Sequence, residues 1–226
     1  MKFLLILYSS LLFADAFRDQ IHDLSEKGQI PLSYRQAREV LFGKIFLKRD
    51  ESGFFIQDIY CEKIFRDNVG PNMIPDHNKL NTEHSWPKNF FSKSYPYKMQ
   101  ESDLFHLYPT DTIANSFRGH LEFEEVYNTE KIPSCALSKR GMDSQNHFGF
   151  EPPDKVKGDL ARSLFYFSVR YKMPIPDNEE EILRKWNLDD PVDSEEKLKN
   201  NLIMEAQGNR NPFIDQEDLA SEIKDF

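Results

Sequence analysis

The chain has 226 residues, of which 39% are hydrophobic, 13% aromatic and 30% charged. This length and composition suffice for one good-sized core or two small ones. The net charge of −9 argues against a protein that coats nucleic acid, because strong polyanion binders carry a basic surface. It does not exclude an enzyme that holds a few phosphates in a locally basic groove.

Residues 1–16 have the features of a secretory signal peptide. Lys2 supplies a positive start, Phe3 to Phe13 is largely apolar, and Ala14-Asp15-Ala16 has the small-residue pattern of a cleavage site. The apolar run is too short to span a bilayer, and the alternative is an N-terminal helix that stays attached. We expect residues 17–226 to form an exported domain, secreted or periplasmic, that does not enter a membrane.

The first elements that the sequence predicts are a helix, a strand and a loop. Ser33 can cap a helix over residues 33–47, whose apolar residues fall on one stripe at helical spacing. Gly53 opens a strand over residues 54–60. Residues 71–81 are rich in Pro, Asn and Asp, which is typical of a loop.

The second half of the chain is predicted to be mainly helical. Residues 104–108 indicate a short strand that Pro109 stops, and Thr110 or Asp111 can cap the helix that follows. After a loop around Cys135, helices are expected over residues 154–171, 179–186 and 194–205, and the tail from Ser221 is expected to fray. The fold class is therefore α+β, a mostly helical single domain with a small sheet.

The chain contains two cysteines, Cys61 and Cys135. In an oxidising compartment an even number of cysteines indicates a disulfide, and the alternative is two separate buried thiols.

The stretch "KLNTEHSWPKNF", residues 79–90, sets Glu83 beside His84. Neighbouring side chains of a strand point to opposite faces, so the two residues can do different jobs at one site. A histidine in a strand can equally be a structural hydrogen-bonding group. A second strand and a helix bearing Asn115 would complete a strand-strand-helix finger around one divalent cation. Oxygen ligands from Glu83 and Asn115 suit Mg²⁺ or Ca²⁺, and His84 could take a proton from water.

Four stretches in order resemble the endonuclease I family of secreted or periplasmic bacterial nucleases, which use a ββα-metal (His-Me finger) site. They are "TEHSWPK", "DLFHLYPTDTIANSFRG", "FEPPDKVKGDLARSLFYFSVRY" and "QGNRNPFID". The resemblance implies that His84 is the general base and that Glu83 and Asn115 hold one Mg²⁺, for which Ca²⁺ or Mn²⁺ can substitute. It also implies products with 5'-phosphates. This chain has Phe105 where relatives with a "DLHHL" sequence have a histidine. If that histidine orients the finger or binds a metal-bound water in those relatives, this contribution is missing here.

Other residues are assigned to the site with their alternatives open. Arg118 is expected to reach a phosphate at the catalytic site, or else to pair with Asp103 or Glu122. His106 is either a hydrogen-bonding support, as Asp103 could be, or a core residue. Candidate phosphate contacts are Lys88, Lys93, Lys98 and Arg162, of which Arg162 could instead form a buried ion pair.

The leading hypothesis is a monomeric, Mg²⁺-dependent and largely sequence-nonspecific endonuclease that acts on DNA, with RNA as a further substrate. One alternative is a non-catalytic secreted binding protein that keeps the finger as a structural calcium site. Another is a phosphoesterase for small esters or phospholipids, which would need a deeper apolar pocket. Dependence of activity on His84 distinguishes the first from the second.

Overall fold

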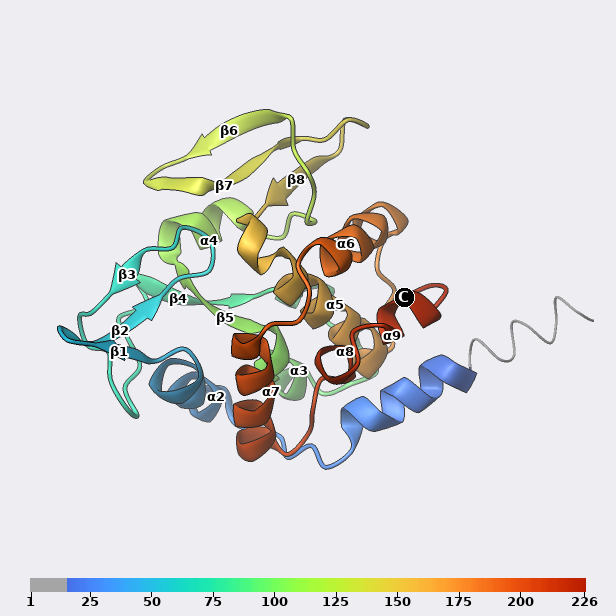
Figure 1. Ribbon diagram of the computed structural model, residues 1–226, viewed down its shortest axis with the longest axis horizontal. Helices are drawn as coiled ribbons and strands as arrows, with labels where there is room; N and C mark the ends of the chain where they lie inside the picture. The colour runs from blue at the N-terminus through green and yellow to red at the C-terminus, as the bar shows by residue number, and fades with distance from the viewer. Residues whose placement is uncertain (1–15) are drawn as a thin grey trace, which may run out of the picture.

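The computed structural model describes residues 16–226, and the first 15 residues of the expected signal peptide lie outside that range. Helices pack together with three small antiparallel sheets, one of which runs through the middle of the molecule while the other two lie at its margins (Figure 1). This arrangement agrees with the predicted α+β class. Over the described range, no helix combines the length and the apolarity needed to cross a bilayer.

Residues 16–26 form the first described helix, and the remaining helices follow along the chain. The α-helices are α2 Tyr34–Val40, α3 Tyr97–Glu101, α4 Thr112–Arg118, α5 Lys157–Tyr171, α6 Asp177–Asp189, α7 Ser194–Gln207, α8 Pro212–Asp215 and α9 Leu219–Glu222. A π-helical turn, η1 Leu41–Ile45, continues α2, and short 3-10 turns are η2 Lys88–Phe90, η3 Leu104–His106 and η4 Asp154–Val156.

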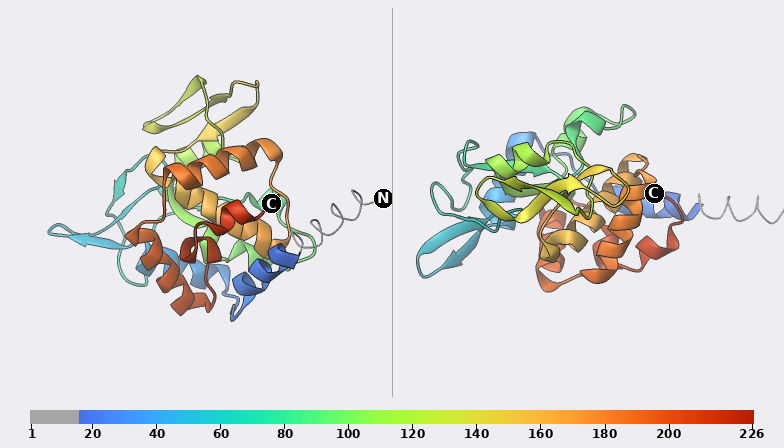
Figure 2. Two further views of the ribbon diagram at one scale, coloured as in Figure 1. Left: turned by 45° about the vertical axis from the view of Figure 1, so that its right-hand side comes forward. Right: turned by 90° about the horizontal axis from the view of Figure 1, so that it is seen from above.

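Eight strands are described, in three antiparallel sheets with the orders β1-β2-β3, β4-β5 and β6-β7-β8. They are β1 Lys48–Asp50, β2 Gly53–Gln57, β3 Ile64–Phe65, β4 Leu80–His84, β5 Leu107–Asp111, β6 Asn128–Ile132, β7 Cys135–Met142 and β8 Phe148–Glu151. The β1–β2 hairpin projects away from the helices in both views of Figure 2.

The core is built on α5, which is buried along nearly its whole length. Its aromatic residues stack on both sides, with Phe167 against Trp86 at 5.0 Å and Phe165 against Phe226 at 4.3 Å between ring centroids. Phe226 is 1% exposed, so the expectation of a frayed tail from Ser221 is wrong. Burial of the last aromatic ring orders the C-terminus, and each such ring contributes roughly 1.5–3 kcal/mol.

The predicted helix over residues 33–47 is present in two parts. Ser33 caps it through a capping box, in which Gln36 N donates to the serine hydroxyl at 3.3 Å. From Leu41 the helix widens into the π-helical turn. There Gly43 meets the loop around Asn72, where an added Cβ would lie 2.6 Å from the Asn72 amide nitrogen.

Two predictions about strands are wrong. Residues 104–106 form a 3-10 turn, and β5 continues through Pro109 to Asp111. Proline is tolerated there because β5 pairs on one side only, with β4, and the Pro109 carbonyl still accepts from Ile59 N at 3.0 Å. The loop expected around Cys135 is instead part of the β6–β8 sheet, in which Cys135 begins β7.

The predicted disulfide between Cys61 and Cys135 is present. It joins the segment after β2 to the first residue of β7, 74 positions away. The bridge therefore anchors one end of the β6–β8 sheet to the part of the chain that precedes β4.

Candidate functional site

A cavity of about 400 Å³ opens between β4, α4 and the start of α2. β4 and β5 are antiparallel, with Glu83 opposite Tyr108 and His84 opposite Leu107, and α4 follows β5 directly. Asp111 caps α4 by accepting from Ile113 N at 3.0 Å, so one residue ends the strand and starts the helix. The lining residues are Tyr34, Asn81, Thr82, Glu83, His84, Pro87, Lys88, Asn89, Asn115, Gly119 and His120.

Glu83 lies at the floor of this cavity and is 2% exposed. Its Oε1 accepts a hydrogen bond from the Tyr60 hydroxyl at 2.8 Å and lies 3.2 Å from Nη1 of Arg118. Its Oε2 makes no hydrogen bond to the residues that the structure describes. Burial raises the pKa of Glu83, and the Arg118 charge and the Tyr60 hydrogen bond oppose that rise. One carboxylate oxygen is thus fixed and the other is left for a ligand.

His84 is 7% exposed and held in one tautomer. Its Nε2 lies 3.1 Å from the carbonyl oxygen of Glu101, and a carbonyl can only accept, so Nε2 carries the proton. Nδ1 keeps its lone pair and has no hydrogen bond within the described chain. Burial lowers the pKa of His84 well below its ordinary value, and neighbouring His106 adds to the effect. The imidazole is therefore neutral at pH 7 and able to accept a proton.

Asn115 reaches the same cavity from α4. Its side chain is half-buried, and over residues 16–226 its amide makes no hydrogen bond. The Asn115 amide oxygen and Glu83 Oε2 are thus two oxygen atoms at one cavity that could bind a metal ion. Mg²⁺ and Ca²⁺ prefer oxygen ligands of this type. These residues fit a divalent cation that keeps several water ligands.

Arg118 is 1% exposed and does not line the cavity. Besides Glu83, it donates to the backbone carbonyls of His84 at 3.2 Å and Ser85 at 2.6 Å, and it lies over the Phe123 ring at 4.8 Å. Its carboxylate partner is thus Glu83 rather than Asp103 or Glu122. Arg118 therefore holds the end of β4 through these backbone contacts, from a buried position outside the cavity lining.

Of the candidate phosphate contacts, Lys88 alone lines the cavity. Its side chain is 43% exposed, and its Nζ lies 3.7 Å from Glu101. Lys93 and Lys98 are exposed but lie outside the cavity lining. Arg162 is fully buried in an ion pair with Glu196, which is the structural alternative expected for it.

His106 and Asp103 lie behind the site. His106 is fully buried, its ring centroid is 5.2 Å from that of His84, and its Nε2 lies 2.7 Å from the Gln100 carbonyl oxygen. Asp103 is also buried and accepts from the hydroxyls of Tyr166 and Tyr171. Phe105, whose place in the motif was noted above, packs on the Tyr166 ring at 4.6 Å.

Sequence reasoning missed Tyr60, which binds Glu83 from the segment after β2. Its carbonyl accepts from the Ser138 hydroxyl of β7 at 2.7 Å, and its neighbour Cys61 forms the disulfide. In the sequence near Tyr60, the only feature that pointed to this residue was its position next to Cys61. Tyr34 and His120 were also missed, because they reach the cavity from elements distant from the Glu83-His84 motif.

Comparisons with known proteins bear on this site. The family model described as Endonuclease I matches residues 33–218. An extracellular ribonuclease of Bacillus amyloliquefaciens is 39% identical over 164 residues, which are 63% of this chain and 53% of that relative. An extracellular ribonuclease of Bacillus subtilis (strain 168) is 31% identical over 229 residues, 92% of this chain and 74% of the relative. An extracellular deoxyribonuclease of Aeromonas hydrophila is 26% identical over 126 residues, 55% of this chain and 54% of the relative. The chain thus spans about half the length of two of these three.

Proposed function

Since the chain belongs to the endonuclease I family, we propose that it is a secreted endonuclease that depends on Mg²⁺ and cleaves largely without sequence preference. The observation that carries the proposal is the cavity on which Glu83, His84 and Asn115 meet. A carboxylate oxygen, an amide and a neutral imidazole with a free nitrogen face one space there. Phosphodiester hydrolysis by a single metal ion needs this combination of groups.

The proposed substrates are DNA and RNA. The relatives include proteins named as ribonucleases and as deoxyribonucleases. Nonspecific cleavage relies on phosphate contacts rather than on base readout. Lys88, at the cavity edge, is the proposed phosphate contact, and it supplies local positive charge on a chain of net charge −9.

In the proposed mechanism His84 is the general base. Its Nδ1 accepts a proton from the attacking water while Nε2–H stays bonded to the Glu101 carbonyl, so the ring does not rotate during the transfer. A Mg²⁺ ion held by Glu83 and Asn115 would supply Lewis-acid stabilisation of charge on the phosphate and the leaving 3'-oxygen. Tyr60 and Arg118 orient the Glu83 carboxylate, and the cleaved strand keeps a 5'-phosphate.

The rival function is a non-catalytic binding protein with a structural calcium ion at Glu83 and Asn115. A structural calcium site does not require the imidazole of His84. In this protein that ring is fixed in one tautomer, has a nitrogen without a hydrogen bond among the described residues, and lines the cavity. The geometry of His84 therefore favours the nuclease.

We further propose that residues 1–16 are a signal peptide, that the exported domain of residues 17–226 works outside the cytoplasm, and that it is a monomer. The relatives named as extracellular proteins support this location.

The test is nicking of supercoiled plasmid, and cleavage of a single-stranded RNA, in Mg²⁺ and in EDTA. The proteins are the wild type, His84→Ala and the control His77→Ala, which removes an exposed histidine outside the cavity lining. We expect the wild type and His77→Ala to cleave in Mg²⁺ only. Loss of a general base predicts cleavage by His84→Ala slower by about 10²–10⁴-fold. Cleavage in EDTA, or full activity of His84→Ala, would contradict the proposal.

A further inference from the structure

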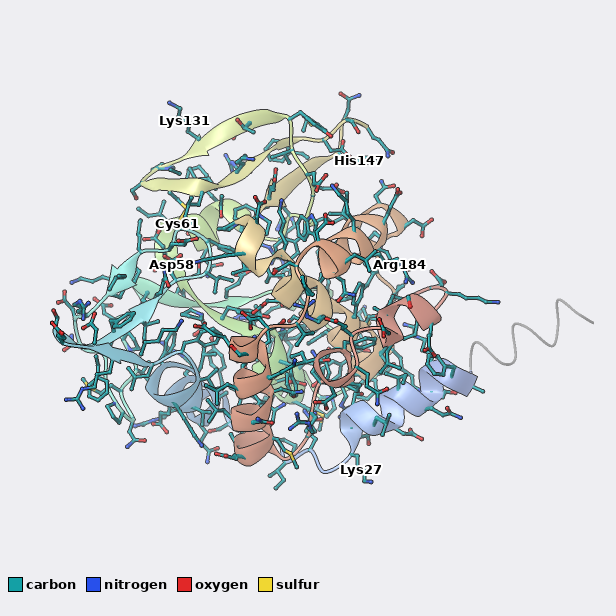
Figure 3. The ribbon with its side chains drawn as sticks, viewed as in Figure 1. Lys27, Asp58, Cys61, Lys131, His147 and Arg184 are labelled. Atoms are coloured by element: carbon teal, nitrogen blue, oxygen red, sulfur yellow. A yellow bond between two sulfur atoms is a disulfide. The ribbon has the colours of Figure 1, made fainter. Side chains whose placement is uncertain are left out.

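A second cluster of metal-binding side chains lies at the β7–β8 turn, outside the lining of the catalytic cavity. Glu124, Asp143 and His147 each bring one ligand atom, and these atoms lie within 4.8 Å of one another. Glu124 comes from the segment between α4 and β6, whereas Asp143 and His147 begin and end the turn. His147 marks this end of the β6–β8 sheet in Figure 3.

Glu124 is the group that most requires a ligand. It is 2% exposed, and its Oε1 is buried without a hydrogen-bond partner among the described residues. Gly149 of β8 gives it room, because an added Cβ there would lie 2.4 Å from the Cβ of Glu124. A buried carboxylate oxygen without a partner is unfavourable unless a cation or a donor reaches it. The cluster is therefore more than a set of solvated acidic residues.

Asp143 and His147 are fixed by the turn they enclose. Oδ1 of Asp143 accepts from the backbone N–H groups of Gln145 at 2.8 Å and His147 at 2.7 Å. Its Oδ2 lies 3.4 Å from Nδ1 of His147. From the first turn of α6, the Asn178 amide nitrogen, which can only donate, lies 2.9 Å from the same ring nitrogen. An ion bound at Nδ1 would replace this contact, while Oδ1 of Asp143 keeps both of its backbone partners and holds that carboxylate in place.

We propose that Glu124, Asp143 and His147 bind a Zn²⁺ ion that has a structural role. Zn²⁺ binds His nitrogen and Asp or Glu oxygen atoms, usually with four ligands, and a water would complete this set of three side chains. The imidazole disfavours Ca²⁺ and Mg²⁺, which take oxygen ligands, and Zn²⁺ binds such sites more tightly than Mn²⁺. Zinc ligands in a tetrahedron lie about 3.3–3.6 Å apart, and Asp143 Oδ2 and His147 Nδ1 already meet this spacing at 3.4 Å. The three ligand atoms lie within 4.8 Å of one another, so a small inward shift closes the set around an ion.

The ion would tie the free end of the β6–β8 sheet to the body of the protein. The opposite end, where β7 begins, is already held by the Cys61–Cys135 disulfide. Of the three strands, β8 has three of its four residues buried, whereas β6 is an edge strand that pairs with β7 alone. A cross-link at each end would hold β6 and β7 in one position against the body of the protein.

The experiment measures Zn²⁺ retained after equilibrium dialysis, by elemental analysis, together with the shift of Tm on adding Zn²⁺. The proteins are the wild type, Glu124→Gln, His147→Ala and the control His77→Ala, which removes an exposed histidine outside the cluster. Any zinc bound at the catalytic cavity is common to all four, so the differences between them report on the cluster.

We expect His77→Ala to match the wild type. Glu124→Gln and His147→Ala should each lose one equivalent of zinc, or bind it at least about tenfold more weakly, and lose the Tm increase. His147 is half-exposed, so its alanine variant should fold even if Glu124→Gln does not. Equal zinc content and equal Tm shifts in the wild type and His147→Ala would overturn the proposal, as would a wild type that retains no zinc.

Discussion

Replacing Arg118 with methionine should destabilise the protein strongly, although Arg118 does not line the cavity at Glu83 and His84. The change removes the ion pair with Glu83 and the donors to the His84 and Ser85 carbonyls, and the paired Arg118 and Glu83 side chains are only 1% and 3% exposed. Removing one partner of a buried ion pair costs about 3–5 kcal/mol, because the other charge is left unpaired. For a domain of this size the expected decrease in Tm is about 6–20 °C.

The assay is urea denaturation followed by circular dichroism, with a double-mutant cycle that combines Arg118→Met and Glu83→Gln. The free energy of unfolding should fall less in the double variant than the sum of the decreases in the two single variants. The reason is that Glu83→Gln removes the carboxylate charge that Arg118→Met leaves unpaired. Arg35→Met is the control, because Arg35 pairs with Glu39 at the surface with 84% of its side chain exposed. A loss below about 1 kcal/mol for Arg118→Met, or additive losses in the cycle, would refute this reasoning.

Three further predictions concern pH, the disulfide and the metal. Burial lowers the pKa of His106 to about 3 from an ordinary 6.5, so the unfolded chain takes up a proton first as the pH falls. This effect is absent above pH 6.5 and lowers the free energy of unfolding progressively toward pH 3, by up to about 4–5 kcal/mol. Urea midpoints of the wild type and His106→Phe should therefore diverge between pH 7 and pH 4, and parallel pH profiles would contradict the assignment. Replacing Cys61 and Cys135 together with serine should reduce the free energy of unfolding by about 4 kcal/mol, measured by urea denaturation, because the bridge closes a loop across 74 positions. An unchanged midpoint would contradict that. Asn115→Ala should raise the Mg²⁺ concentration for half-maximal cleavage about 10-fold or more while Tm stays within about 2 °C, and an unchanged Mg²⁺ requirement would exclude Asn115 as a ligand.

Local sequence rules located the parts of the site that local structure determines. The Ser33 capping box and the helix that carries Asn115 depend on neighbouring residues, and both are present where the pattern predicted them. The Glu83-His84 strand was found for the same reason. The disulfide was predictable because two cysteines leave a single intramolecular pairing.

The contacts that tune the site come from distant segments, and no local pattern encodes them. Tyr60 reaches Glu83 across 23 positions, and the Glu101 carbonyl reaches His84 across 17. The β6–β8 sheet was missed because β6 is polar, β7 lacks strict alternation of apolar and polar residues, and β8 is only four residues long. Its order comes from its attachments, which include the disulfide and the backbone pairing of Glu124 N with the Phe150 carbonyl at 3.1 Å.

The measurement that tests the central claim most directly is rescue of His84→Gly by free imidazole in single-turnover cleavage of a plasmid. The account predicts that cleavage by His84→Gly is slow and rises with the concentration of neutral imidazole, because the base enters the space beside Glu83 that the ring has left. Wild type and Asn115→Ala should not respond to imidazole. Failure of imidazole to restore cleavage in a folded His84→Gly protein that still binds Mg²⁺ would contradict the claim that His84 is the base.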